Sequence, residues 1–271
     1  MVGMVERLRA GVSARQARVV LFDFDGTVSL IRSGWVDVMV PMMVEILLDL
    51  KTGESEESLR ALVDDFVGRL TGKQTMYQMI ELANQVELRG GKPLEPLLYK
   101  KRYLELLDAK IAYRIEELRQ GQVPPEKYLV PGVRRVLETL AGRGLKMYLA
   151  SGTDQPYMRD EATLVDVSKY FDGRVYGALD DYKSFSKKIL IQQLIASAEC
   201  EGAAFLGFGD GYVEIENVKE VGGVAVGVAT AEPECLKVDE WKRQRLVGVG
   251  ADFVIPNFLC HDELMSALFP E

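Results

Sequence analysis

The chain has 271 residues, 48% of them hydrophobic, so it can bury a substantial core as one large domain or two. Asp and Glu number 41 against 33 Lys and Arg, a balance that argues against a nucleic-acid-binding surface. The single histidine, His261, excludes a histidine-based metal site, and three cysteines without a Cys-x-x-Cys pair favour a reducing compartment. No apolar segment is long enough to span a membrane and no signal peptide is evident, so we expect a cytoplasmic protein.

The first predicted element is a buried strand over residues 19–22, which ends in two acids. Asp23 and Asp25 are one residue apart and precede a turn at Gly26. Strand side chains alternate between faces, so both carboxylates point to the same side and repel each other. A divalent cation or a shared proton would hold such a pair together. On this segment alone, an ordinary Asp-Gly turn is an equally good interpretation.

From about residue 32 to residue 120 the pattern is helical. Leu59, Val63 and Phe66 follow the spacing of one amphipathic helix, and Leu104, Leu107 and Ile111 follow that of another. Glycines separate the predicted helices at positions such as 53, 72 and 90.

After residue 128 short apolar strands alternate with helices, a pattern typical of a parallel sheet covered on both faces. The strands are predicted over 146–150, 174–176, 204–208, 224–228 and 252–255. We therefore predict an α/β fold with a Rossmann-like parallel sheet, formed by residues 1–30 and 122–271. An all-helical domain over 31–121 is inserted into a loop of this core.

In open parallel sheets, ligands bind beyond the carboxyl ends of the strands. Residues that could bind a cation or a phosphate follow several of the predicted strands. They are Asp23 and Asp25, then Ser151 and Gly152, then Asp210 and Glu214. A lysine at 187 begins a helix that leads toward the same edge. Carboxylate oxygens suit a hard cation, and lysine, hydroxyl and backbone N–H groups suit phosphate, so the set suits phosphoryl transfer.

The order of these pieces resembles the haloacid dehalogenase (HAD) superfamily, in the branch of phosphoglycolate phosphatase and β-phosphoglucomutase. The four motifs are Asp23-Phe-Asp-Gly-Thr27, Ser151-Gly-Thr153, a lysine near 187, and Gly209-Asp-Gly-Tyr-Val-Glu214. Pro131-Gly-Val133 also looks like this branch, and the helical insert is placed like its cap domain. Together the motifs are specific, although each one alone is weak.

The resemblance implies a phosphomonoester hydrolase that acts through an aspartyl phosphate on a small phosphorylated metabolite, either a sugar phosphate or a phosphoglycolate-like acid. Asp23 would be the nucleophile and Asp25 the general acid and base. Mg²⁺ would be held by Asp23, Asp210 and the backbone carbonyl of Asp25. Ser151, Gly152 and Thr27 would bind substrate. The second acid, Asp25, excludes a dehalogenase of this fold, and a sugar phosphomutase remains the alternative.

Three assignments within the motifs stay open. Lys183, Lys187 and Lys188 all compete for the third motif, and we favour Lys187 because it shares a helical stripe with Leu190 and Leu194. Glu214 is either an outer ligand of Mg²⁺ or a group that orients Lys187, and an acid in the first turn of a helix also needs no function. Ser151 has the alternative role of a helix N-cap before residue 155.

The loop 71–75 lies between two predicted helices of the insert. By the resemblance it would reach over the substrate, which makes Lys73, Gln74 and Arg32 candidates for binding the leaving group; a solvated turn is the alternative. We interpret the basic run 241–245 as a solvated helix face. A dinucleotide-binding loop at 207–211 is disfavoured because Asp210 and Glu214 would lie where a pyrophosphate must bind.

Overall fold

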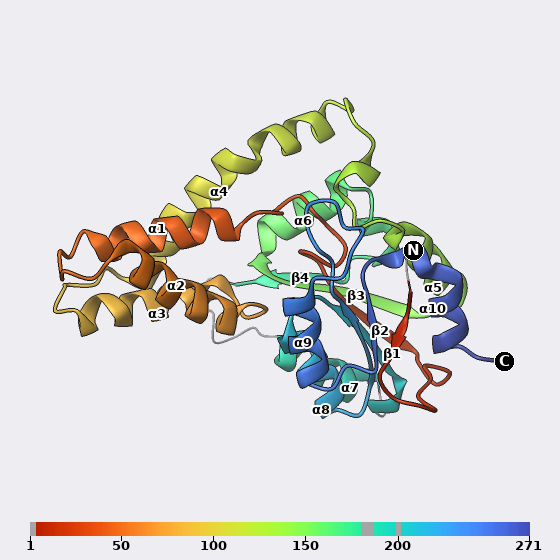
Figure 1. Cartoon of the computed structure of the whole chain (residues 1–271). Helices are drawn as coiled ribbons and strands as arrows, with labels where there is room; N and C mark the ends of the chain where they lie inside the picture. The colour runs from red at the N-terminus through yellow and green to blue at the C-terminus, as the bar shows by residue number, and fades with distance from the viewer. Residues whose placement is uncertain (1–3, 180–186, 199–201) are drawn as a thin grey trace.

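The computed structural model describes residues 4–179, 187–198 and 202–271. Figure 1 shows a part built around a β-sheet on the right and a group of helices that projects from it on the left. Both chain ends lie on the sheet side, away from the projecting helices. An internal segment therefore forms the helical group, and the chain then returns to complete the sheet.

Within the described residues, seven strands form one sheet in the order β1-β7-β6-β5-β2-β3-β4. Strand β1 runs antiparallel to β7, and all other neighbouring pairs are parallel. The expected α/β class with a Rossmann-like sheet is confirmed. The strands are β1 (Glu6–Arg7), β2 (Val19–Asp23), β3 (Lys146–Asp154), β4 (Val175–Ala178), β5 (Phe205–Gly209), β6 (Val224–Val228) and β7 (Phe253–Ile255).

Strand β2 lies between β3 and β5 and is buried along its whole length. Its alternate side chains pack on opposite faces of the sheet. Val19 and Leu21 belong to the buried cluster of α7, α8 and α9, whereas Val20 and Phe22 belong to that of α5, α6 and α10. These helices are α5 (Val133–Gly142), α6 (Gln155–Leu164), α7 (Lys187–Ala198), α8 (Tyr212–Glu220), α9 (Glu240–Gly248) and α10 (His261–Leu268).

Strand β3 is longer than predicted, because it continues past Ala150 to Asp154. Its pairing with β4 shifts register between these two residues. Ser151 therefore lies inside the final part of the strand, not after it. The two-residue strand β1 was not predicted, since Glu6 and Arg7 are too few to show an alternating pattern.

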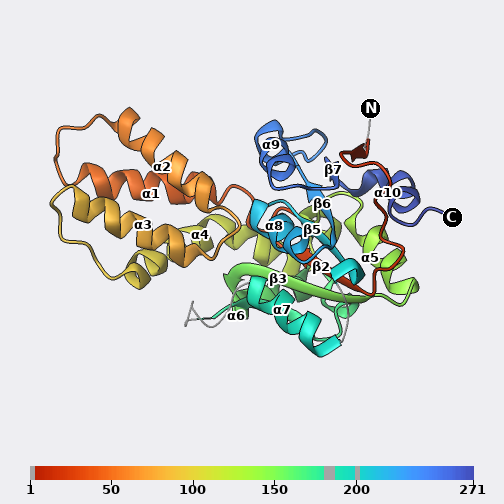
Figure 2. The same cartoon turned by 90° about the horizontal axis from the view of Figure 1, so that it is seen from below.

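The projecting helices are α1 (Val36–Leu48), α2 (Glu56–Leu70), α3 (Thr75–Leu88) and α4 (Pro96–Arg119). Figure 2 shows them on one side of the molecule, with α5 and α10 on the other. Ser55 caps α2, since its hydroxyl accepts a hydrogen bond from the backbone N–H of Ser58 at 3.2 Å. The boundaries 31 and 121 of the inserted domain stay a prediction. None of the helices described here has the length and apolar character that a membrane span requires.

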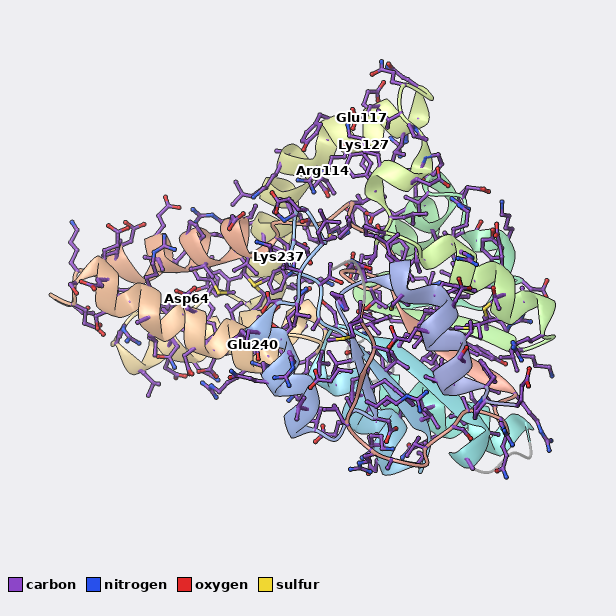
Figure 3. All side chains as sticks on the ribbon, turned by 45° about the vertical axis from the view of Figure 1, so that its right-hand side comes forward. Asp64, Arg114, Glu117, Lys127, Lys237 and Glu240 are labelled. Atoms are coloured by element: carbon purple, nitrogen blue, oxygen red, sulfur yellow. The ribbon has the colours of Figure 1, made fainter. Side chains whose placement is uncertain are left out.

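Arg114 of α4 binds the segment through which the chain leaves the sheet. Its Nη1 donates to the backbone oxygens of Leu30, Ile31 and Ser33 at 3.3, 2.8 and 2.8 Å. One turn further along α4, Glu117 accepts a hydrogen bond from Lys127, where the chain returns (Figure 3). The second half of α4 thus contacts both connections between the helical group and the sheet.

Candidate active site

Asp23, the last residue of β2, contacts a buried ammonium group. Lys187, the first residue of α7, places Nζ 2.6 Å from Oδ1 of Asp23 and also binds Oε1 of Glu214. The exposed fractions of the three residues are 6%, 6% and 2%. Lys188 is half exposed and pairs with Glu220 instead.

The structure thus brings Lys187 to Asp23, as the helical spacing predicted. Among the described lysines of this helix, Lys187 is the one that points to the end of β2. The third candidate, Lys183, lies outside the described residues.

Burial and charge act in opposite directions on these groups. Burial raises the pKa of Asp23 well above its usual range, and the Lys187 ammonium offsets only part of that rise. Burial lowers the pKa of Lys187, but the carboxylates of Asp23 and Glu214 outweigh it and raise that pKa overall. Lys187 therefore stays charged in a buried site and can supply the positive charge that a phosphate requires.

Asp25 accepts hydrogen bonds from two hydroxyl groups. The hydroxyls of Ser151 and Thr153 donate to its Oδ2 at 2.8 and 2.9 Å. Its other oxygen, Oδ1, is buried and has no hydrogen-bond partner in the part of the chain that is described. A buried oxygen of this kind indicates a place for a proton or a ligand. The alternative role of Ser151 as an N-cap is wrong, because Asp154 occupies that position before α6.

The oxygen donors at this edge fit a hard divalent cation. Asp210 follows β5, and its charge helps to raise the pKa of Asp23. Gly26 has φ +75° and lies close to the side chain of Asp210. A Cβ atom on Gly26 would lie 2.3 Å from Oδ2 of Asp210. Across residues 4–179, 187–198 and 202–271, no three Asp, Glu, His or Cys side chains form a ligand set alone. One or two carboxylates with water and phosphate oxygens suffice for Mg²⁺, and Asp23 and Asp210 offer such a pair.

Glu214 lies in the first turn of α8 and is engaged by Lys187 through Oε1. Its Oε2 is buried and has no hydrogen-bond partner among the described residues. Gly211 leaves room for this carboxylate, since a Cβ atom there would lie 2.5 Å from Oε2. The contact supports the interpretation that Glu214 orients Lys187, which was one of its two predicted roles.

The loop between α2 and α3 packs against the same edge of the sheet. A Cβ atom on Gly152 would lie 3.0 Å from the backbone oxygen of Lys73. Likewise, a Cβ atom on Gly211 would lie 3.1 Å from Cα of Gly72. Backbones approach this closely only where side chains are absent. The alternative of a solvated turn is therefore wrong for this loop, although the Lys73 side chain itself is exposed.

A cavity of about 100 Å³ lies between this loop and the sheet. The sheet side of the cavity is lined by the carboxylates and the phosphate-binding groups predicted from the motifs, and the helical side by several cations. The lining includes Asp23, Asp25, Ser151, Gly152, Lys187 and Asp210 on one side, and Arg32, Lys73 and Lys100 on the other.

Two of the three cations on the helical side are paired with acids. Arg32 binds Glu161 through Nη2 at 2.6 Å and through Nε, and both side chains are buried. Lys100 of α4 pairs with Asp154 at the end of β3. Sequence reasoning missed Lys100 because its helical pattern showed only an amphipathic face. Lys100 is only 5% exposed in the structure, and no pattern in the sequence marks its burial.

Two predicted substrate-binding residues, Thr27 and Gln74, are not among those that line this cavity. Thr27 is fully buried and its hydroxyl has no hydrogen-bond partner in the described chain. Gln74 is buried at the start of α3 and lines an adjoining cavity together with Ser151, Gly152 and Lys187. Substrate binding by these two residues stays a prediction.

The interpretation of 241–245 as a solvated helix face is wrong for one residue. Lys242 turns inward, and its Nζ lies 2.9 Å from Oδ2 of Asp210 and 3.1 Å from Oε1 of Glu232. Two nearby carboxylates compensate its burial, which a count of charges along the helix could not reveal. Trp241, by contrast, is half exposed.

Residues 17–222 match the model of the haloacid dehalogenase-like hydrolases. The chain belongs to this family. The matched segment runs from before Asp23 to beyond Glu214, so it contains all four motifs, and it ends before α9. No curated protein matches the chain.

Solved structures share the fold of this hydrolase at low sequence identity. A predicted phosphoglycolate phosphatase from Haemophilus somnus 129PT has a TM-score of 0.59 and 15% identity, covering 92% of this chain and 98% of that one. A haloacid dehalogenase-like protein of unknown function, ATU0790 of Agrobacterium tumefaciens C58, has a TM-score of 0.57, 18% identity and coverages of 93% and 98%. A HAD-family hydrolase from Deinococcus radiodurans R1, solved with phosphate and sodium, has a TM-score of 0.53, 12% identity and coverages of 94% and 96%.

Proposed function

We propose that the hydrolase is a Mg²⁺-dependent phosphatase that cleaves a small phosphorylated metabolite through an aspartyl phosphate. One observation carries the proposal: Asp23 and Asp25 line a single cavity but have different partners. Asp23 accepts a hydrogen bond from the ammonium of Lys187. Asp25 accepts hydrogen bonds from the hydroxyls of Ser151 and Thr153. Two carboxyl groups in different surroundings suit different roles, one as nucleophile and the other as acid and base.

In the first step, a carboxylate oxygen of Asp23 attacks phosphorus and the bond to the leaving oxygen breaks. Asp25 gives its proton to that leaving oxygen. In the second step, Asp25 takes a proton from a water molecule whose oxygen attacks phosphorus, and the bond to Asp23 breaks to release phosphate.

The phosphoryl oxygens need positive charge and N–H donors during both steps. We assign this role to Lys187, the hydroxyl of Ser151 and the backbone N–H of Gly152, which line the cavity. Mg²⁺ held by Asp23, Asp210 and the backbone oxygen of Asp25 would neutralise charge on the phosphate. We assign Glu214 to holding Lys187, on the basis of the ion pair between them.

The leaving group would face the helical side of the cavity, where Arg32, Lys73 and Lys100 lie. Because Glu161 and Asp154 neutralise two of these cations, the surroundings suit a polar group such as a sugar hydroxyl or one carboxylate. A sugar phosphate or a phosphoglycolate-like acid meets this requirement, and the composition of the chain supports a cytoplasmic site of action.

The test uses p-nitrophenyl phosphate, whose leaving group needs no proton from the enzyme. With Mg²⁺ we expect phosphate release that EDTA abolishes and that Asp23→Asn lowers at least about a thousandfold. Asp25→Asn should accumulate a phosphorylated protein, detected as the mass of one phosphoryl group, because the second step lacks its base. Lys188→Met, next to Lys187 but facing solvent, is the control and should stay within about twofold of wild type.

The same assay separates the phosphatase from a phosphomutase. A panel of sugar phosphates and phosphorylated acids is incubated with the enzyme, and both inorganic phosphate and isomerised sugar phosphate are measured. Stoichiometric phosphate release supports the proposal. Isomer formation without phosphate release, or activity that Asp23→Asn leaves intact, would contradict it.

A further inference from the structure

Lys242 occupies a position at which a lysine is unfavourable. It lies in the first turn of α9, where the helix dipole repels cations, and its backbone N–H binds the capping Asp239 at 3.0 Å. Its side chain is nevertheless only 16% exposed and points toward Asp210. Its ammonium group lies 2.9 Å from Oδ2 of Asp210, a residue that lines the active-site cavity.

The ammonium contacts the oxygen of Asp210 that faces the catalytic loop. Lys242 binds Oδ2 of Asp210, and this same atom would clash with a Cβ atom on Gly26. Gly26 directly follows Asp25, so Oδ2 points to the loop that carries Asp23 and Asp25. A divalent cation bound between Asp23 and Asp210 would approach this oxygen and repel the ammonium.

Glu232 offers the ammonium a second partner. Its Oε1 lies 3.1 Å from Nζ of Lys242. The side chains of Asp210, Glu232 and Lys242 all line a cavity of about 630 Å³ that opens between α9 and the helical insert. The fully buried hydroxyl of Thr230, which lacks a hydrogen-bond partner in the described chain, lines it too. Lys242 thus has room to leave Asp210 while it keeps Glu232.

Helix α9 is also in contact with the insert. A Cβ atom on Gly68 of α2 would lie 3.1 Å from the ring of Trp241. Figure 3 shows Glu240, at the start of α9, and Asp64 of α2 on the same side of the molecule, where these helices meet. Lys242 and Glu232 lie beyond residue 222, where the match to the family model ends.

We propose that Lys242 is an internal cation that competes with Mg²⁺ for Asp210, and that Glu232 holds its ammonium group after Mg²⁺ has displaced it. The inference rests on the proposed function, because it takes Asp210 as a Mg²⁺ ligand. Lys242 is a positioning residue, since it contacts a ligand-binding carboxylate and not the reacting phosphate. In the absence of Mg²⁺ it neutralises Asp210 and so lowers the affinity of the site for the ion.

The test measures Mg²⁺ binding by isothermal titration calorimetry, without substrate. Lys242→Met should bind Mg²⁺ about tenfold more tightly than the wild type, because the competing charge is gone. Arg245→Met is the matched control: it removes one positive charge from α9, but Arg245 stacks on Trp241 and Tyr212 and should leave Mg²⁺ affinity within about twofold. Asp210→Asn should abolish the binding heat.

A double-mutant cycle tests the role of Glu232. Glu232→Gln should weaken Mg²⁺ binding in the wild type, because the displaced ammonium loses its second partner. The effect should shrink when Lys242 is already Met. Equal weakening in both backgrounds would show that Glu232 acts directly on the ion and would overturn its assigned role.

Three outcomes overturn parts of the scheme. Unchanged or weaker Mg²⁺ binding in Lys242→Met overturns the competition alone. No binding heat in the wild type, or binding that survives Asp210→Asn, overturns the proposed function and the competition with it. Thermal unfolding in EDTA checks that each variant is folded, and Lys242→Gln replaces Lys242→Met in the same titration if the latter is unfolded.

Discussion

The Nζ atom of Lys187 lies 2.6 Å from Oδ1 of Asp23 while it also binds Glu214, so one buried ammonium serves two buried carboxylates. Each partner comes from a different element: the end of β2, the start of α7 and the start of α8. The ion pair therefore links three segments that are far apart in the sequence. Removing the ammonium would leave both carboxylates buried without a counter-charge.

Lys187→Met should lower the free energy of unfolding by about 3–5 kcal/mol and reduce phosphatase activity to background. Urea denaturation and phosphate release measure the two effects. Lys188→Met removes the neighbouring, half-exposed ion pair with Glu220 and should cost about 0.5 kcal/mol or less. Equal stability of the two variants would contradict the structural role of Lys187.

Gly26→Ala should weaken Mg²⁺ binding, because its new methyl group needs the space of the Asp210 carboxylate. Gly53 provides a matched control: its φ is +86°, but a Cβ atom there meets nothing within 4 Å. Both variants carry the cost of a left-handed alanine, about 1–2 kcal/mol in stability. Only Gly26→Ala should also lose about tenfold in Mg²⁺ affinity by calorimetry. Similar affinities for both variants would place Asp210 away from the ion.

Glu161 should make stability depend on pH. Burial raises the pKa of Glu161 to about 7, against the opposing effect of Arg32. The folded protein therefore holds this proton more tightly than the unfolded chain. Its contribution to stability is complete below the ordinary value of 4.5 and is lost as the pH rises through about 7.

The glutamine of Glu161→Gln cannot lose a proton. The decline in melting temperature that Glu161 causes between about pH 5 and pH 7.5 should therefore disappear. The variant should match the wild type most closely at about pH 5, where Glu161 is already protonated. Asp160→Asn is the control on the adjacent, exposed residue, and it should keep the slope of the wild type. If the slope of melting temperature against pH persists in Glu161→Gln, another titrating group must cause it.

Arg114→Met should loosen the connection between the sheet and the helical insert. Its guanidinium binds the backbone oxygens of Leu30, Ile31 and Ser33, and such charged hydrogen bonds contribute about 1.5–3 kcal/mol each. We expect faster hydrogen exchange of the amides around residues 30–35 and a higher KM. Arg119→Met, which breaks an exposed pair with Asp160, should change neither. Unchanged exchange in Arg114→Met would show that the segment needs no such support.

The sheet could be predicted largely from the sequence because its strands are continuous apolar runs. Strand β6, for example, was predicted over 224–228 and has those bounds. Hydrophobic periodicity also selected Lys187 over Lys188, since only one of them shares the inward stripe of α7. The spacing of apolar residues within one strand or helix was enough to predict which of its side chains are buried.

Long-range pairing explains what the sequence could not reveal. Lys100 and Asp154 are 54 positions apart, and Lys242 and Asp210 lie on separate elements, so no local pattern connects them. The burial of a lysine can be predicted only when its acidic partner is known. Thr27 shows the converse, since its motif suggested a ligand contact but its side chain is fully buried.

Gly72 of the insert and Gly211 of the sheet meet with little more than backbone between them, since a Cβ atom on Gly211 would lie 3.1 Å from Cα of Gly72. A seam this thin excludes even a single methyl group, so a substrate that enters between Gly72 and Gly211 needs the two parts of the molecule to separate there. The frequency of that separation would then set an upper limit on turnover.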